Sequence, residues 1–401
     1  MKRRLSPRGA VWTGILATPV VLIAVVAIIA VATAPAGSKQ TGPGSGPVAT
    51  GPANSVNGSP RVVGGVAQTS EAIAAYWTPA RMAAATPKEA VYSGNDSSSS
   101  TAAPTSGQPM KGEGFAPAST RLPGADLPAS PANMSTAEPQ SVPYHTAIPF
   151  TRFEWYPKYL VYPISTVAKM FFTQDGVNYV CSASSIAQDA AWTAGHCVNN
   201  GAAPNTINGG FSYNVLVCPS YDAGVNAQRG CWGSDGLWTL TAYTISGAGN
   251  DDMGIINTTN NGTCCGASTH AGMIGNWTGW LGWAVNFSRE QNWVALGYPQ
   301  GAPFNGNKIQ FDTSEFGYND DWAGFGPLSV AMGNDLTGGS SGGPWVMQFG
   351  KPGQIGGLGN DYLNGHNDWK HTAFPNEMAS PYFDCRFIAL FNAATGSAIA
   401  C

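Results

Sequence analysis

The chain has 401 residues and a formal net charge of −4, and only 10% of its residues are charged. This balance gives no basis for a nucleic-acid partner or a polybasic contact with a membrane, because both need clustered lysine and arginine. The 51 glycines, 29 prolines and 13 tryptophans favour a loop-rich β protein that also carries low-complexity segments.

Residues 1–36 have the pattern of an export signal. Four basic residues stand within the first eight positions, and an uncharged run follows that lasts until Lys39. Its apolar part, residues 15–34, is typical of a signal peptide, and about 20 apolar residues are also enough to span a bilayer as an uncleaved anchor. Either way the rest of the chain is exported. We therefore expect a secreted or extracellular protein, held at a membrane only if the anchor is retained.

Residues 37–148 are rich in Pro, Ala, Ser, Gly and Thr, as in SGNDSSSSTAAPTSGQP at 93–109. They show no sustained apolar period and contain no cysteine. Such a segment buries too little apolar surface to offset the entropy lost on ordering. We predict a disordered linker or pro-segment here, and the pattern allows a short helix around residues 71–85.

Residues 149–401 have a different texture, in which short β-type runs alternate with Gly, Asn, Asp and Pro. The runs are residues 166–173, 177–184, 213–218, 237–245, 253–258, 292–298, 307–313 and 343–349. Many short strands at this spacing predict an all-β sandwich or barrel. One helix is predicted near the C-terminus, with Ser380 as its cap, Pro381 at its first position and apolar residues at helical spacing after them.

All eight cysteines lie in this last part of the chain, and an even number in an exported protein indicates disulfides. Cys218 and Cys231 would close a short loop. The other candidates leave three pairings open among Cys264, Cys265, Cys385 and Cys401. No cluster of side chains has the spacing of a metal site, so we expect neither a metal nor a cofactor.

Three motifs carry candidate chemistry. AWTAGHC at 191–197 places His196 beside a cysteine, NDDMGIINT at 250–258 contains an aspartate pair, and GGSSGGP at 338–344 contains two serines. A serine hydroxyl is a weak nucleophile unless a base accepts its proton and an acid orients that base. Taken singly, the motifs also fit a structural histidine, a turn and a Gly/Ser linker. Together they supply the three groups that such chemistry needs.

The three motifs resemble those of chymotrypsin-like serine peptidases, in which His, Asp and Ser follow one another in this order. The resemblance selects His196 as the base and Asp252 as the acid, because Asp252 begins the pattern Asp-x-Gly-apolar-apolar and Asp251 does not. It selects Ser341 as the nucleophile, with Ser340 at the variable position. It also implies that the N–H groups of Gly339 and Ser341 form the oxyanion hole.

The resemblance implies a disulfide between Cys181 and Cys197, and two six-stranded antiparallel β-barrels with the triad between them. The first barrel would span about 160–262 and the second about 285–401. DLTGGSSGGP and LGYPQG are similar to the bacterial glutamyl-endopeptidase branch. The implied activity is hydrolysis of peptide bonds in proteins or peptides through an acyl-enzyme, by a monomer.

The family pattern is incomplete at the positions that govern activation. RVVGG at 61–65 looks like a trypsin activation site, but Ser340 stands where trypsins keep the activating aspartate. The segment 61–65 also lies much too far before Cys181. We therefore expect the mature N-terminus near residues 145–165 instead.

The positions that govern specificity are equally ambiguous. Asp335 lies six residues before Ser341, where trypsins bind Arg or Lys, but the glutamyl branch often has Asp there as well. Gly359 takes the place of the histidine on which glutamyl specificity relies, and we group it with Asn360 as candidate substrate-binding residues. The preferred residue of the substrate therefore stays open.

Two other functions compete with the peptidase. Gly339-x-Ser341-x-Gly343 matches the nucleophile elbow of an α/β-hydrolase esterase, with His371 and either Asp361 or Asp368 as partners, but that fold needs more helices than the sequence predicts. A catalytically silent, peptidase-like surface binding module is the non-enzymatic alternative. The intact triad positions favour an enzyme.

Overall fold

The computed structural model describes residues 69–92, 107–117, 148–154, 158–201, 207–264, 267–320, 327–350 and 357–401, and short strands between 48 and 67. All of them belong to one compact unit, Lys39–Cys401. The predicted signal or anchor at 1–36 lies outside the described residues. None of the helices in the described ranges has the length and apolar character needed to cross a bilayer.

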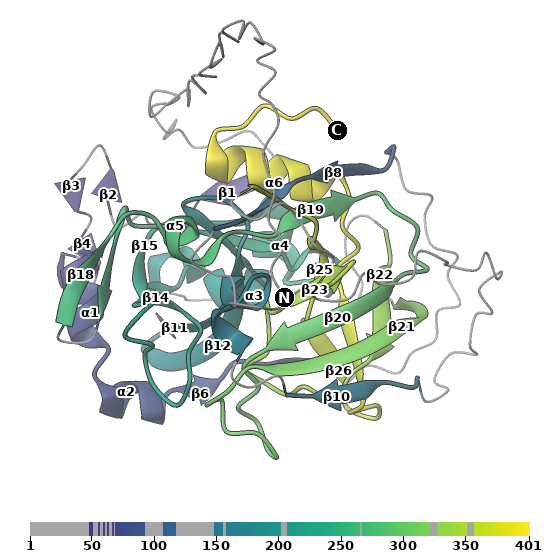
Figure 1. The fold of residues 1–401 in the computed structure, drawn as a ribbon, viewed down its shortest axis with the longest axis horizontal. Helices are drawn as coiled ribbons and strands as arrows, with labels where there is room; N and C mark the ends of the chain where they lie inside the picture. The colour runs from purple at the N-terminus through teal and green to yellow at the C-terminus, as the bar shows by residue number, and fades with distance from the viewer. Residues whose placement is uncertain are drawn as a thin grey trace, which may run out of the picture. The chain divides into compact units, whose positions relative to one another are not determined.

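The first sheet has eight strands (Figure 1); two short ones pair with it at its margins, and the other six form a closed barrel. Its ladder runs β15-β14-β11-β12-β13-β16, and β15 also pairs with β16, which closes the ring. The strands are β11 (Val167–Gln174), β12 (Val177–Ser185), β13 (Ala190–Thr193), β14 (Tyr213–Pro219), β15 (Trp232–Leu240) and β16 (Gly254–Thr258). Every residue of β11 is buried, as expected for a strand covered on both faces.

The second sheet has eleven strands, and its main path does not close on itself within the described residues. Two strands come from the N-terminal segment at 37–148, β7 (Ala90–Tyr92) and β8 (Met110–Gly112), and β10 (Thr151–Phe153) follows just after it. The others are β19 (Gly282–Val285), β20 (Asn292–Gly297), β21 (Gln310–Asp320), β22 (Ser329–Gly333), β23 (Pro344–Met347), β25 (Tyr362–His366), β26 (Trp369–His371) and β27 (Glu377–Ser380).

The remaining elements are short. The strands are β1 (Val48–Thr50), β2 (Ser55–Val56), β3 (Ser59–Pro60), β4 (Val62–Val63), β5 (Val66–Ala67), β6 (Thr86–Pro87), β9 (Gly114–Ala116), β17 (Asn261–Cys264), β18 (Ala267–Ala271) and β24 (Gly357–Gly359). The helices are α1 (Ser70–Tyr76), α2 (Pro79–Ala84), α3 (Gly195–Val198), α4 (Thr241–Ser246), α5 (Ile274–Thr278) and α6 (Cys385–Thr395). Single 3₁₀ turns lie at Lys158–Leu160, Ile164–Thr166, Ile207–Gly210 and Gly249–Asp251.

This architecture confirms the all-β class with a C-terminal helix and corrects two boundaries. The predicted strand at 237–245 ends at Leu240, and α4 follows it. This helix ends where Gly247 takes a left-handed φ of 65°. The C-terminal helix begins at Cys385 and is capped by Asp384, whereas Ser380 still belongs to β27. A mostly antiparallel sheet also excludes the α/β-hydrolase alternative, which requires a parallel one.

The segment expected to be disordered contains one part that is ordered against the barrel. Thr69 caps α1 and Thr78 caps α2, so two helices form where one was allowed. Their apolar residues Ile73, Trp77 and Met82 are buried in the same cluster as β11 and β14. The segment is too short for a core of its own, and it orders by burying these side chains on the first sheet.

Among the cysteines that the structure describes, three disulfides are formed: Cys181–Cys197, Cys218–Cys231 and Cys385–Cys401. The first two are the pairs expected from the sequence, and the third is one of the pairings that stayed open. It joins the start of α6 to the C-terminus.

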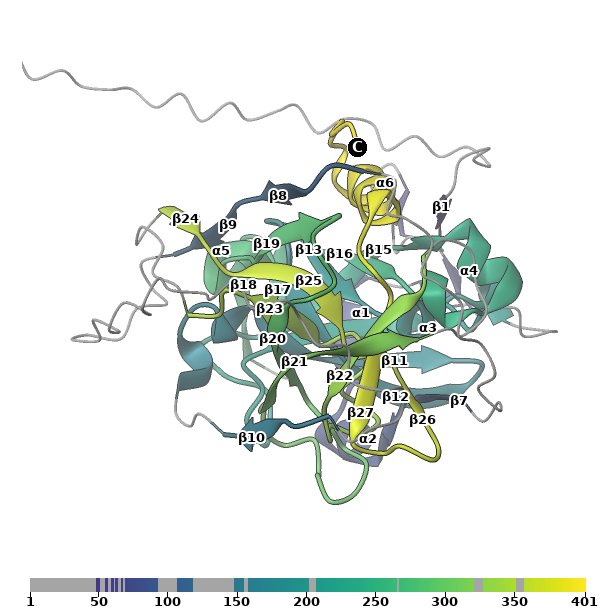
Figure 2. The same cartoon turned by 90° about the vertical axis from the view of Figure 1, so that its right-hand side faces the viewer.

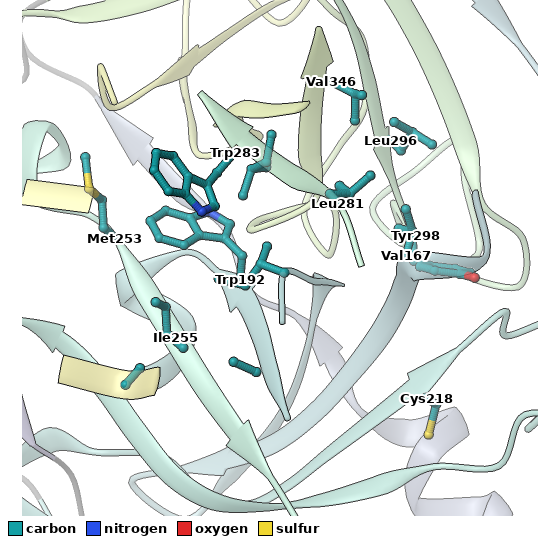
Figure 3. Packing of buried hydrophobic residues seen from close by; sticks show 14 of the residues in the cluster. Val167, Trp192, Cys218, Met253, Ile255, Leu281, Trp283, Leu296, Tyr298 and Val346 are labelled. Carbon is teal, nitrogen blue, oxygen red and sulfur yellow. The ribbon is translucent and has the colours of Figure 1, made fainter. Parts of the chain in front are cut away.

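The main hydrophobic cluster spans both sheets. Trp192 of β13 and Trp283 of β19 both belong to it, as do Met253 and Ile255 (Figure 3). Phe387 of α6 contacts both tryptophans, with ring centroids 4.8 Å from Trp192 and 5.7 Å from Trp283. The helix therefore packs across the two sheets beside the strand that leads to His196.

Candidate active site

His196 and Asp252 are brought together by strand pairing in the first barrel. Thr193 at the end of β13 pairs with Gly254 at the start of β16, so the residues just beyond these ends face each other. Asp252 accepts two hydrogen bonds from His196, at 2.6 Å from the backbone N–H and 2.9 Å from Nδ1. Residue 195, next to the histidine, must lack a Cβ, because a Cβ on Gly195 would lie 2.7 Å from the Asp252 carboxylate.

Ser341 comes from the second sheet and lies beside the same part of the barrel. Its carbonyl oxygen accepts a hydrogen bond of 2.8 Å from the Ser182 N–H on β12. The Cys181–Cys197 bridge joins β12 to α3 and so fixes His196 relative to that strand. Motifs that stand 145 residues apart (341 − 196) in the chain therefore meet at one place.

The loop around Ser341 contains two glycines with a positive φ. Gly339 takes a φ of 95° and Gly342 a φ of 80°, in the region that L side chains avoid. A Cβ on Gly339 would lie 2.9 Å from the Tyr298 carbonyl oxygen, so a glycine is required there on two counts. The Gly339 N–H points into the site, where it donates a hydrogen bond of 3.0 Å to the Lys88 carbonyl oxygen.

A second carboxylate, which sequence reasoning considered only for the esterase alternative, lies close to the same nitrogen of His196. Asp368 Oδ1 lies 3.3 Å from His196 Nδ1, and Asp368 Oδ2 lies 3.6 Å from His366 Nε2. Asp368 is almost completely buried, in the short connection between β25 and β26. Only the folded sheet brings it to the histidine, and no local motif in the sequence marked it.

These contacts decide how the buried groups titrate. Burial by itself lowers the pKa of His196, but the charges and hydrogen bonds of Asp252 and Asp368 outweigh it and raise this pKa to about 9. Burial raises the pKa of Asp252, but the positive charge and hydrogen bonds of His196 outweigh it and lower the pKa overall. Burial and the neighbouring charge of Asp252 raise the pKa of Asp368 to about 6.

The predicted specificity residues lie in three different settings. Asp335 forms an ion pair of 2.9 Å with Arg152 of β10. Gly359 ends β24, where its register partner is Gly114 and a Cβ would meet the Tyr162 hydroxyl. Asn360 accepts a hydrogen bond of 3.4 Å from the Tyr362 hydroxyl.

A small cavity lies directly beside Ser341, and none of the three predicted specificity residues lines it. It is lined by Glu89, Ala90, Thr337, Gly338, Ser340, Ser341, Asp368, Lys370 and Met378. Lys370 is a buried lysine in the wall of this cavity. Its ammonium group donates hydrogen bonds to the carbonyl oxygens of Asn334 and Pro375. The topology thus adds Lys370 to the candidate site, again from the segment after β25.

His196, Asp252 and Asp368 also offer ligand atoms within 4.8 Å of one another. A cation bound there would have to displace the proton that His196 Nδ1 shares with Asp252, because a metal ligand must present a lone pair. His371, the base that the esterase alternative requires, lies 2.8 Å from Asp320 through its Nε2 and is engaged there.

Neither a protein-family model nor a curated protein sequence matches the chain. Similar solved structures include the protease Anisep from Arthrobacter nicotinovorans, at 27% identity, 58% of this chain, 96% of that chain and a TM-score of 0.47. A thermostable serine protease, AL20, from an extremophilic microorganism has 28% identity, 58% and 98% coverage and a TM-score of 0.48. A Glu endopeptidase has 18% identity, 61% and 97% coverage and a TM-score of 0.44.

The molecule itself supplies the features on which a classification can rest. A closed six-stranded barrel carries a buried His–Asp pair, and a second sheet carries a Gly-rich serine loop. The three candidate residues follow in the order His, Asp, Ser along the chain. In fold and in the order and placement of these residues, the protein resembles the trypsin- and chymotrypsin-like serine peptidases.

Proposed function

We propose that the protein is an exported serine endopeptidase that hydrolyses peptide bonds in protein or peptide substrates through an acyl-enzyme. The observation that carries the proposal is the buried hydrogen-bonded pair of His196 and Asp252 next to the Ser341 loop. The three disulfides support export, since such bonds persist in oxidising compartments.

In the proposed reaction, Ser341 Oγ attacks the substrate carbonyl carbon while His196 Nε2 takes the hydroxyl proton. The oxyanion that forms accepts hydrogen bonds from the N–H groups of Gly339 and Ser341. The tetrahedral intermediate then breaks its C–N bond, and the leaving amine takes the proton from Nε2. Water repeats the sequence on the acyl ester, which releases the acid and restores Ser341.

The carboxylates keep the imidazole in one orientation during these steps. Asp252 accepts the Nδ1 proton, which leaves Nε2 as the proton acceptor for Ser341. We assign Asp368 a positioning role, because its negative charge beside Nδ1 favours the imidazolium that forms when the serine proton is taken.

The proposal is tested with a phosphonylating serine reagent and a peptide library. Both are applied to the exported chain before and after limited proteolysis. We expect Ser341→Ala and His196→Ala each to abolish turnover. The double variant should be scarcely worse than either single one, because triad members act as a unit.

Ser340→Ala is the matched control, since it removes the adjacent hydroxyl and should leave the labelled serine in place. Labelling or turnover that persists in Ser341→Ala would refute the assignment of the nucleophile. Absence of both labelling and hydrolysis under every condition would favour the silent binding module.

A further inference from the structure

Residues 85–92 of the N-terminal segment cross the candidate active site. On one side, Thr86 and Pro87 of β6 pair in parallel with Tyr179 and Val180 of β12. On the other side, β7 (Ala90–Tyr92) pairs in parallel with β26, the strand that follows Asp368 (Figure 2). The segment therefore bridges the two sheets where the candidate residues meet, with Lys88 and Glu89 between the two pairings.

The Lys88 carbonyl group lies against Gly339, one of the two proposed oxyanion donors, and against the Ser341 hydroxyl. Its oxygen accepts a hydrogen bond of 3.0 Å from the Gly339 N–H and one of 3.4 Å from Ser341 Oγ. The Ser341 hydroxyl thus has its hydrogen bond with the peptide oxygen, and none joins it to the base. His196 Nε2 is buried and, within the described part of the chain, has no hydrogen-bond partner. A serine that does not donate to the base cannot transfer its proton in an attack.

The side chains show that the segment does not lie as a substrate would. The Lys88 ammonium turns to the first barrel, where it donates to Gln174 Oε1 at 2.9 Å and lies 4.5 Å from the Tyr179 ring centroid. The next residue, Glu89, lines the cavity beside Ser341, against Gly338. In a substrate, one residue supplies both the carbonyl in the oxyanion hole and the side chain in the specificity pocket. Here two successive residues divide these roles.

The helices before the crossing segment anchor it to the barrel. Trp77 is 1% exposed and its ring centroid lies 5.5 Å from that of Phe171. The Tyr76 hydroxyl donates to Asn178 Oδ1 at 2.9 Å, and the Ala85 carbonyl accepts a hydrogen bond from Gln300 Nε2. An anchor joined to the blocking residues by a few peptide bonds raises their local concentration at the site far above that of a free peptide.

We propose that residues 69–92 are a built-in inhibitor of the peptidase, in which α1 and α2 dock on the first barrel and the Lys88 carbonyl occupies the Gly339 donor of the oxyanion hole without being cleaved. The chain becomes active when this segment leaves the site. The inference rests on the proposed function, because it regulates the same serine.

The test measures how fast a fluorophosphonate labels Ser341 in the full chain. Lys88→Pro removes the N–H that donates to the Val180 carbonyl oxygen and the side-chain contacts of Lys88. We expect labelling to become about three to ten times faster, the range that corresponds to the loss of one or two hydrogen bonds. Trp77→Ala removes a large buried anchor and should speed labelling by about a hundredfold. Trp77→Phe, which keeps an aromatic anchor, should stay within a few-fold of the parent.

Every variant is first checked for folding by circular dichroism, and each is also made with Ser341→Ala to show that the label is specific. If Trp77→Ala does not fold, Lys88→Pro decides alone, because Lys88 lies outside the core. Mass spectrometry of the labelled chain should find the Lys88–Glu89 bond intact.

Equal labelling rates in the parent, Lys88→Pro and Trp77→Ala would overturn the inhibitor and leave the peptidase standing. A cut between Lys88 and Glu89 that disappears in Ser341→Ala would also overturn it, since the segment would then be a substrate. If no chain is labelled, even after the segment has been removed, it is the proposed function that fails.

Discussion

His196 stands between two carboxylates, and this setting decides how the histidine responds to pH. Its pKa is raised to about 9 because Asp252 and Asp368 outweigh the effect of burial. The folded state therefore binds this proton more tightly than the unfolded chain does. The resulting stability is fully present below about pH 6.5 and is lost as the pH rises through about 9.

The same setting predicts the pH dependence of catalysis. The base must be neutral to accept the serine proton, so activity should rise as the pH passes the pKa of His196. Asp368→Asn removes one of the two negative charges, so this pKa should fall and the acidic limb of kcat/KM should move to lower pH, by about one unit. The profile is measured on the chain after release of the N-terminal segment.

Asp361→Asn is the control for this shift, because Asp361 is another buried carboxyl group, which accepts its hydrogen bond from the Gly350 N–H. It should leave the acidic limb in place. An unchanged limb in Asp368→Asn would remove Asp368 from the positioning of His196.

Gly339 carries a second prediction at the residue scale. Gly339→Ala would place a Cβ 2.9 Å from the Tyr298 carbonyl oxygen at a φ of 95°, so the loop must shift and its N–H must leave the oxyanion position. We expect kcat to fall about a hundredfold, the effect of losing one oxyanion donor. Gly176→Ala is the matched control, because Gly176 also has a positive φ, 84°, but nothing within 4 Å.

For that control we expect a stability loss of about 1 kcal/mol and an unchanged kcat. A kcat loss in both variants, in proportion to their loss of stability, would contradict the specific role of Gly339.

The helix α6 gives the prediction at the scale of an element. Phe387 contacts Trp192 of the first sheet and Trp283 of the second, so its truncation opens a cavity in the cluster that both sheets share. Phe387→Ala should lower the free energy of unfolding by about 3–5 kcal/mol. Ile245→Ala on α4 is the control, because Ile245 is 69% exposed and should change stability by less than about 0.5 kcal/mol. Denaturant unfolding measures both, and a similar small change in the two variants would contradict the bridging role of Phe387.

Individual elements also show what a sequence can and cannot predict. The strand β11 was recognisable because its buried residues form one continuous β-type run. The predicted strand at 237–245 overlaps β15 only at Leu237–Leu240 and runs on into α4, because the β-branched residues of α4 have strand propensity; Gly247 ends that helix. The propensities of the residues indicate that an element is present, whereas a capping residue sets the position at which the element ends.

The candidate site divides in the same way. His196, Asp252 and Ser341 each lie in a local motif, so the sequence could name them. Asp368 and Lys88 lie in no motif, and they reach the site only through sheet pairings with partners far away in the chain. Contacts of that kind depend on the whole topology, which a single sequence does not display.

At the scale of the whole molecule, the N-terminal segment belongs to both halves of the fold. It adds β6 to the first sheet and β7 and β8 to the second, and it buries Trp77 in the shared cluster. A partner that binds only the folded state raises the melting temperature. Removal of the segment should therefore lower the Tm, by about 5 °C or more.

The measurement compares the intact Ser341→Ala chain, which cannot process itself, with the same chain cut by an added protease and freed of the segment by gel filtration. A sample that is cut but not separated is the control and should keep most of its Tm. Equal melting temperatures in all three samples would show that the segment contributes nothing to stability.

The placement of the Lys88 carbonyl has a consequence for timing. A blocking peptide that the enzyme can hydrolyse is used up by the enzyme, and the delay before activity is then a clock that starts at synthesis. In this chain Lys88 supplies the carbonyl group at the Gly339 N–H, whereas Glu89 supplies the side chain in the cavity beside Ser341. A segment held in this way is not hydrolysed by the enzyme that it blocks. The delay then has no intrinsic length, and activity begins only when another agent, such as a second protease in the surroundings, removes the segment. The start of activity would then depend on the surroundings that the chain has reached, and not on the time since its synthesis.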